Sequence, residues 1–223
     1  MKAAQKPPKR PRKASAKQSV ARLQSYHHGD LHDALLKAAE KVLERDGVQG
    51  LTLRAAAREA GVSHAAPTHH FGDMTGLLSE LAAVGFRRFG AALRDAASHE
   101  ASAHARLDAM GMAYVTFART YPGLFMLMFR SERLDFDRPA LREAMQDANA
   151  ALAQGVAAQR REAVTPGRPT LQQAAEMVRA WSMVHGFAVL LLDHRLDNFL
   201  GLLPDGNPDG LLSAVLRPPR DKR

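Results

Sequence analysis

The chain of 223 residues contains no cysteine. This absence excludes a disulfide framework, a thiol nucleophile and a thiolate metal site. Strand signals are scarce, because neither a β-branched alternation nor an Asn-Gly hairpin turn occurs. No apolar run approaches the ~18 residues of a membrane span, and the basic N-terminus lacks the apolar core of a signal peptide. The composition of the chain, with 46% hydrophobic residues and charges of both signs, is typical of a globular protein with a buried core.

Acidic residues are missing from the first 29 positions. This segment holds eight of the 31 lysine and arginine residues, so the remaining 23 balance the 23 acidic residues. Its composition cannot bury enough apolar surface to fold, and we predict a disordered basic arm at residues 1–25. A polyanion such as a phosphate backbone is the expected partner, and a solubilising tail is the alternative. The expected contacts are Lys9, Arg10, Arg12 and Lys13.

The chain after the arm carries the periodicity of helices. The first helix is expected from Leu31, with Asp30 as its N-cap and Gly47 as its end. Thr170 with Gln173 predicts a capping box. The predicted fold class is all-α, with about nine helices. They are expected at residues 31–46, 53–60, 64–71, 74–97, 103–120, 123–130, 139–162, 171–195 and 208–216.

Two short predicted helices are joined by the three residues Gly61, Val62 and Ser63. Thr52 is the expected N-cap of the first helix and Gly61 its left-handed end, while Ser63 is the expected N-cap of the second. Pro67 fits the start of a helix, where it costs at most one hydrogen bond. Such a layout is a helix-turn-helix, whose second helix enters the major groove of DNA. The expected DNA contacts are Thr52, Arg54, Ser63, His64, Ala65, Thr68, His69 and His70.

The histidines of this segment also raise the question of a metal site. His69 and His70 are adjacent, so their side chains point about 100° apart on a helix. His64 lies five positions from His69, and no carboxylate completes a ligand set. We therefore predict no metal. Hydrogen bonds to bases or phosphate are the preferred interpretation, and a solvated polar face is the alternative.

The motifs YHHGDL (residues 26–31), LTLRAAAREAGVSHAAP (51–67) and His70-Phe71 resemble the N-terminal domain of TetR-type transcriptional regulators. WSMVHG (181–186) resembles the signature of the WHG-type C-terminal subclass, and GLFMLMF (123–129) belongs to the same pattern. Two positions depart from the family. Thr68 replaces the usual tyrosine and Met74 the usual lysine, and both family residues normally touch the DNA backbone.

The resemblance implies a helix-turn-helix domain at residues 26–73, a ligand-sensing and dimerisation domain at 74–217, and a tail at 218–223. It also implies a homodimer that binds a near-palindromic DNA operator and usually represses transcription. The location that we expect is the cytoplasm, whose reducing conditions fit a chain without cysteine. A small molecule releases the operator, no cofactor is needed, and the last two helices form the dimer. The expected dimer residues are Phe187, Leu190, Leu191, Leu211, Leu212 and Val215.

A cluster of methionine and aromatic residues lies in the C-terminal half. At helical spacing it forms either a plain core or an adaptable apolar pocket. The pocket would take a small apolar or aromatic compound, with Tyr114, Trp181 or His185 giving a polar contact. The expected ligand residues are Met110, Tyr114, Phe117, Phe125, Met128, Trp181 and His185.

Two other classes of protein are alternatives to this interpretation. An all-α enzyme would need convergent titratable groups, but paired carboxylates on one helix, a His-Glu metal motif and a glycine-rich phosphate loop are all missing. The chain is therefore predicted not to be an enzyme. The alternative that stays open is an architectural DNA binder, indifferent to sequence and driven by the basic arm.

Overall fold

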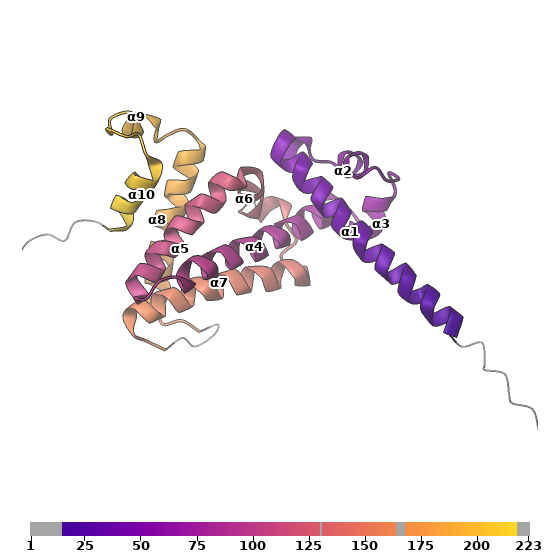
Figure 1. Ribbon diagram of the computed structural model, residues 1–223, viewed down its shortest axis with the longest axis horizontal. Coiled ribbons are helices and arrows are strands. Elements are labelled where there is room, and N and C mark those ends of the chain that lie inside the picture. The colour runs from indigo at the N-terminus through magenta and orange to yellow at the C-terminus, as the bar shows by residue number, and fades with distance from the viewer. Residues whose placement is uncertain (1–14, 130, 164–167, 218–223) are drawn as a thin grey trace, which may run out of the picture.

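The computed structural model describes residues 15–129, 131–163 and 168–217, with the backbone alone for residues 15–30 and 131. The described residues form ten α-helices and one short 3-10 helix, and no strand occurs among them (Figure 1). The all-α prediction is therefore confirmed. The helices are α1 (Ser15–Gly50), α2 (Leu53–Ala60), α3 (Ala66–Phe71), α4 (Met74–Ser98), α5 (Ala103–Thr120), α6 (Pro122–Met128), α7 (Pro139–Arg160), α8 (Leu171–Leu192), α9 (Asp197–Leu200) and α10 (Pro208–Leu216), with η1 (Ser131–Arg133) between α6 and α7.

Helix α1 begins earlier than the sequence suggested. It starts at Ser15, so Asp30 lies inside the helix and is not its N-cap, and the helix continues into the segment predicted as a disordered arm. Residues 15–25 are rich in Ala, Lys, Gln and Arg, which are good helix formers. Lys9, Arg10, Arg12 and Lys13 lie outside the described residues. At Gly47 the backbone leaves the helical region (φ 68°), as expected for the glycine that ends the regular helix.

Helices α1, α2 and α3 form a small N-terminal unit around a shared core. The apolar face of α1 packs against α2, and Phe71 closes the core from the end of α3. Helix α3 begins at Ala66 instead of the predicted His64, and its N-cap is Ala65, which makes no side-chain capping bond. Ser63 is therefore not the N-cap: its carbonyl, not its hydroxyl, accepts a hydrogen bond from the N–H of Ala66 at 3.1 Å.

Helix α4 leaves this unit and runs into the C-terminal bundle, where it packs along α5 and α7 (Figure 1). Asp73 caps it, since its Oδ1 accepts from the N–H of Gly76 at 2.8 Å. Gly85 lets α6 approach closely: a Cβ at this position would lie 2.7 Å from Sδ of Met128 and 3.0 Å from Leu124. The short helix α6 is thereby held against the middle of α4.

Helix α8 has the predicted capping box, with Thr170 and Gln173 bonding each other's backbone. It ends at Leu192 and not near Arg195, because the chain turns at His194, whose φ is positive (58°). By length and composition, α8 is the one described helix that could cross a membrane. Helix α8 is apolar on two faces. Phe187 and Ala188 are buried in the core, whereas Leu190 lies on an exposed face. The four-residue helix α9 was not predicted.

Candidate functional site

The turn between α2 and α3 is held by backbone chemistry that the sequence predicted. The hydroxyl of Thr52 accepts a hydrogen bond from the N–H of Ala55 at 3.0 Å, as an N-cap does. Gly61 adopts the left-handed conformation (φ 69°), and Val62 donates its N–H to the carbonyl of Ala57 at 3.0 Å. Ala56 and Ala57 are fully buried, which allows α2 to lie close to its neighbours. This is helix-turn-helix geometry.

The predicted DNA contacts of the helix-turn-helix are exposed to solvent, with one exception. His70 is half-buried beside α1, and its ring lies 6.0 Å from that of His32. The exposed residues lie at the start of α2 (Thr52, Arg54), on the turn (Ser63, His64, Ala65) and on α3 (Thr68, His69). Met74 is half-buried and packs against the core, so it replaces the usual family lysine with an apolar contact. Arg58, a second exposed cation on α2, was missed by the sequence interpretation.

Three polar contacts join the N-terminal unit to the C-terminal bundle. The carboxylate of Glu44 on α1 accepts from the N–H groups of Gly123 and Leu124, at 3.0 and 2.9 Å. These N–H groups belong to the first turn of α6, which a negative charge stabilises. Arg88 on α4 binds both carboxylate oxygens of Glu40, and its guanidinium lies 4.7 Å from the ring of Tyr121. The N-terminal unit is thus fixed to both α4 and α6.

The third contact comes from the start of α7. The guanidinium of Arg138 donates to the backbone carbonyl of Phe71 at 3.0 Å and to the carboxylate of Glu80 at 3.1 Å. Phe71 is the last residue of α3, so this contact fixes the end of the predicted recognition helix to the C-terminal bundle. A side chain at Gly76 would collide with both the Phe71 carbonyl and the guanidinium.

The C-terminal bundle contains a partly open cavity of 490 Å³, bounded by α4, α5, α7 and α8. Aromatic side chains from α4, α5, α8 and the end of α6 line it, together with leucine, methionine and valine residues. The aromatic residues are Phe86, Phe89, Tyr114, Phe129 and Trp181. A cavity of this size and character suits a small organic molecule.

The predicted ligand residues divide into two groups. Met110, Tyr114 and Trp181 line the cavity. The others do not: Phe117, Phe125 and Met128 are buried in the core, and His185 lies behind the wall. Because helical spacing gives these residues the same pattern, the sequence could not separate wall from core. The wall also carries polar residues that were missed, namely His104, Asp108, Asn149, Gln159, Glu176 and Arg179.

Tyr114 joins the wall to His185. Its hydroxyl accepts from Nε1 of Trp181 at 3.2 Å and donates to Nδ1 of His185 at 2.8 Å. Burial raises the pKa of Tyr114 well above its usual value, so its hydroxyl stays protonated. Burial also lowers the pKa of His185, which favours the neutral imidazole whose Nδ1 accepts this hydrogen bond. The network is therefore neutral, and it supports one side of the aromatic wall.

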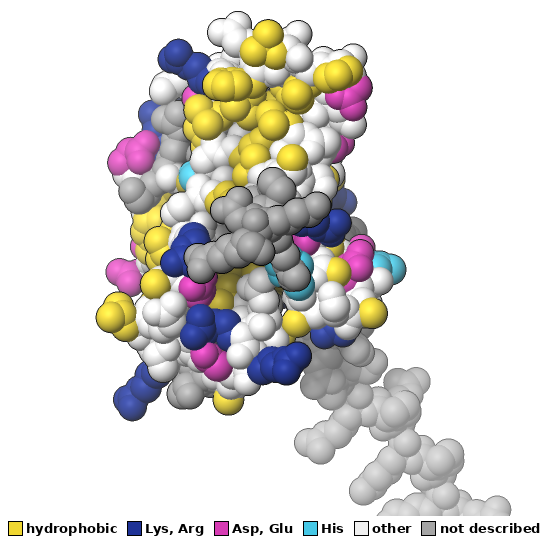
Figure 2. Space-filling view, turned by 90° about the vertical axis from the view of Figure 1, so that its left-hand side faces the viewer, with side chains coloured by type: hydrophobic (Ala, Val, Ile, Leu, Met, Phe, Trp, Pro, Cys, Tyr) yellow, Lys and Arg dark blue, Asp and Glu magenta, His cyan; other side chains and the backbone are white. Residues whose placement is uncertain are grey.

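The predicted dimer residues also differ in exposure. Leu190 and Val215 are exposed and Leu191 and Leu211 are half-buried, whereas Phe187 and Leu212 are buried within the chain. Figure 2 looks onto the end that carries α8, α9 and α10, and hydrophobic side chains gather over its upper part. Further exposed apolar residues on α8, α9 and the turn that follows are Leu171, Val178, Trp181, Met183, Phe199 and Leu202, and of these only Trp181 was predicted as a site residue, for the ligand. In the described part of the chain, no group of three or more His, Asp or Glu side chains could hold a metal ion.

Comparison with known proteins identifies both halves of the chain. Residues 35–81 match the family model described as bacterial regulatory proteins, tetR family, and residues 107–215 match the tetracyclin repressor-like C-terminal domain. No curated protein matches the chain. A solved protein of unknown function from Rhodococcus sp. RHA1 is 37% identical, with a TM-score of 0.67, and the match covers 86% of this chain and 96% of that one.

More distant solved structures share the fold. The transcriptional regulator FadR from Bacillus subtilis, in complex with stearoyl-CoA, is 14% identical with a TM-score of 0.60, over 84% of this chain and 98% of that one. The TetR family transcriptional regulator PfmR from Thermus thermophilus is 18% identical with a TM-score of 0.53, over 83% and 95% of the two chains.

Proposed function

Since the chain belongs to the TetR family of bacterial regulatory proteins, and is a DNA-binding transcription regulator and not an enzyme, we propose that it is a repressor. It binds a near-palindromic operator as a homodimer in the cytoplasm, and a small apolar or aromatic ligand releases it. The observation that carries this proposal is the physical connection between a ligand-sized cavity and the helix-turn-helix through α6 and Glu44.

The DNA contacts of the proposal fall into two kinds. Thr68, His69 and His64 reach base edges from α3 and the turn that precedes it, because exposed residues at the start of a recognition helix face the groove. Thr52, Arg54, Ser63, Ala65 and His70 lie beside the phosphates and fix the position of the unit. Lys9, Arg10, Arg12 and Lys13 of the arm add charge along the backbone, in place of the cation that Met74 does not supply.

Release follows from the position of α6. Phe129, directly after α6, lines the cavity, while the first turn of α6 is bonded to Glu44 on α1. A ligand that displaces Phe129 therefore moves α6 and, with it, α1. Helix α1 packs on α2, so the displacement changes the placement of the helix-turn-helix on DNA. Bistable packing of this kind converts a small shift into a change of state.

The dimer of the proposal forms on the exposed apolar side of α8 and α10, around Leu190 and Val215. Two chains related by a twofold axis place two recognition helices about 34–36 Å apart, which matches major grooves one helical turn apart. The half-buried Leu191 and Leu211 lie at the border of this surface.

Selection of bound sequences from a random duplex pool, at two salt concentrations, tests the proposal. We expect an enriched inverted repeat at both concentrations. Binding without an enriched motif, lost as the salt concentration rises, would instead indicate the architectural binder, because phosphate contacts alone are strongly salt-dependent.

A further inference from the structure

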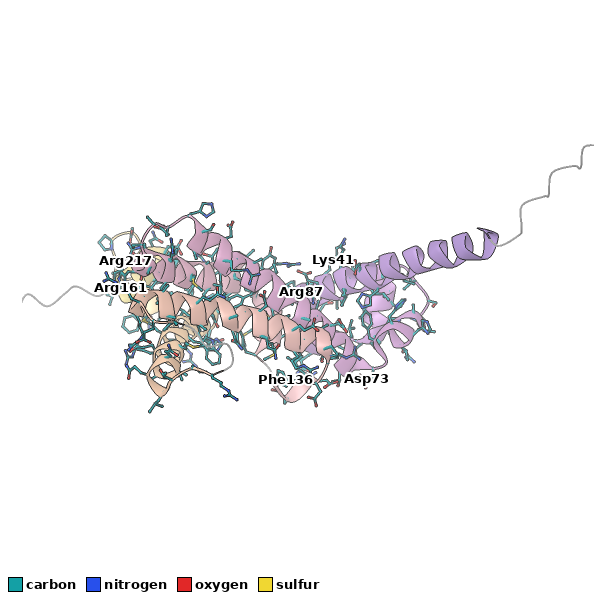
Figure 3. All side chains as sticks on the ribbon, turned by 90° about the horizontal axis from the view of Figure 1, so that it is seen from below. Lys41, Asp73, Arg87, Phe136, Arg161 and Arg217 are labelled. Atoms are coloured by element: carbon teal, nitrogen blue, oxygen red, sulfur yellow. The ribbon has the colours of Figure 1, made fainter. Side chains whose placement is uncertain are left out.

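The two ends of the cavity differ in chemistry. The aromatic residues lie towards α6, where Phe129 and Trp181 meet. The polar residues come from the beginning of α5, the second half of α7 and the beginning of α8. Arg161, which follows α7, and Arg217, which follows α10, lie at the end of the molecule opposite α1 (Figure 3). The cavity is therefore amphipathic, with its polar end away from the helix-turn-helix.

Asp108 is the buried charge of the polar end. Its side chain is 8% exposed, and its Oδ2 accepts a hydrogen bond from Nε of Arg217 at 2.5 Å. Its second oxygen, Oδ1, receives no hydrogen bond from any residue that the structure describes. The side chain of Arg217 is 59% exposed, so the carboxylate faces the cavity while its cation approaches from solvent. A buried carboxylate needs such a partner.

The residue before Arg217 completes an amphipathic pair. Leu216 lines the cavity, and it fits because Gly111 on α5 has no side chain: a Cβ there would lie 2.9 Å from Cδ2 of Leu216. The chain thus places an apolar side chain and a cation of its own, Leu216 and Arg217, at the polar end of the cavity. Arg217, which pairs with Asp108 from the solvent side, supplies the cation that the charged group of a ligand would replace.

We propose that the cavity takes an amphipathic organic cation, with a flat aromatic body among Phe86, Phe89 and Trp181 and an ammonium or amidinium group at Asp108. The ligand cation displaces Arg217 from the carboxylate, and Arg217 then turns into solvent. This proposal rests on one part of the proposed function, namely that the cavity is the ligand site.

An anionic ligand fits the same end poorly. Its charged group would either lie against Asp108 or remove Arg217 and leave the buried carboxylate without a cation, which is strongly unfavourable. Three other arginines lie near this end. Arg179 is 70% exposed and binds Glu176, and the half-buried Arg160 binds Glu162, so both are already paired. Arg161 is exposed to solvent and does not line the cavity.

Three fluorescent probes with one aromatic body test the proposal on the full chain. They are 9-(aminomethyl)anthracene, a cation, 9-anthracenemethanol, which is neutral, and anthracene-9-carboxylate, an anion. Fluorescence titration without DNA gives the dissociation constant of each for the wild type, Asp108→Asn and Arg217→Gln. Thermal melting of each variant reports whether it is folded.

We expect the amine to bind the wild type about tenfold more tightly than the alcohol, as a hydrogen bond to a charged group allows, and the carboxylate to bind most weakly. Asp108→Asn removes the advantage of the amine and leaves the alcohol unchanged. Arg217→Gln tightens the amine alone, because its competitor is gone. If Asp108→Asn does not fold, Arg217→Gln carries the test.

Three results would overturn the proposal: equal or tighter binding of the alcohol or the carboxylate, amine binding that neither substitution changes, or no binding of any probe. Tight binding of the alcohol would leave the cavity as a ligand site and the proposed function intact. A failure of the proposed function would show itself separately, as the lack of a selected DNA motif.

Discussion

The carboxylate of Glu44 accepts a hydrogen bond from the backbone N–H of Leu124, which lies 80 residues further along the chain, at 2.9 Å. A second bond, from Gly123, makes Glu44 the cap of α6 although it belongs to α1. The first turn of α6, the helix that leads to the cavity wall, is therefore capped by a side chain of the N-terminal unit. This contact gives the account of ligand release its physical basis.

Replacing Glu44 by alanine should weaken the connection between the two parts of the chain. Because the contact is a charge-assisted pair of hydrogen bonds at a largely exposed position, we expect the free energy of unfolding to fall by about 1 kcal/mol. Urea denaturation measures this change. Glu143→Ala, an exposed acid on α7, is the matched control and should have no effect. Equal stability of the two variants would mean that Glu44 does not connect α1 to α6.

Gly85 and Gly90 form a matched pair on α4. An alanine at position 85 would press on Met128 and Leu124, and overpacking of this kind costs about 1–3 kcal/mol. An alanine at position 90 would meet its nearest neighbour at an ordinary 3.4 Å and should stabilise the helix by up to about 1 kcal/mol. Thermal unfolding of both variants measures the difference. A Gly85→Ala protein as stable as Gly90→Ala would mean that α6 does not pack closely on α4.

The lowered pKa of His185 predicts a fall in stability on mild acidification. The unfolded chain takes up a proton at the usual pKa, near 6.5, whereas the folded chain resists protonation until a lower pH. The stability is therefore complete above about pH 6.5 and is lost as the pH falls through the folded pKa. Urea unfolding of the wild type and His185→Gln across this range tests the point. The wild type should show the steeper fall, and parallel curves would contradict the assignment.

Two substitutions separate reading of bases from binding of phosphates. His69→Ala should cost about 1–3 kcal/mol on the preferred operator and change the preference at one position of each half-site. Arg54→Ala should weaken binding to all sequences and reduce the salt slope by about 0.9 per removed contact. Fluorescence anisotropy on matched and mismatched duplexes measures both effects. Arg195→Ala, an exposed cation after α8, is the control. If the two variants behaved alike, the division of roles would be wrong.

Leu190→Glu should separate the dimer, because a charge on the exposed face of α8 would be buried without a partner. Phe136→Glu serves as the control, since Phe136 is exposed but lies near Asp73, at the start of α4 (Figure 3). Sedimentation velocity distinguishes one chain from two. A Leu190→Glu protein that stays dimeric would place the interface elsewhere.

Local chemistry made much of the fold predictable. Thr52, Gly61 and the Thr170–Gln173 pair act as caps or helix ends within a few residues of themselves, and all three behave as predicted. The start of α3 was misplaced because serine is a common N-cap. In the structure the carbonyl of Ser63, and not its hydroxyl, accepts the N–H of Ala66, so a turn precedes the helix. The start of α1 was misplaced because residues 15–25 combine the low apolar content of a disordered arm with residues of high helix propensity, and the propensity decides the structure there.

The cavity wall was less predictable for a physical reason. Phe125 and Phe129 lie four residues apart and share a helical pattern, yet Phe125 is in the core and Phe129 is on the wall. The packing of α8 decides which of the two side chains lines the cavity. The hydrophobic periodicity of one helix gives no information on how another helix packs against it. Asp108, a lone acid between Leu107 and Met110, was the one local signal of a polar wall.

The central claim is that two copies of this chain read one inverted repeat. Anisotropy titration of labelled duplexes that carry the selected half-site once, as an inverted repeat one helical turn apart, or as the same bases scrambled tests it most directly. We predict two chains per inverted repeat and much tighter binding there than to the single or scrambled site. Equal affinity for all three duplexes would contradict the account.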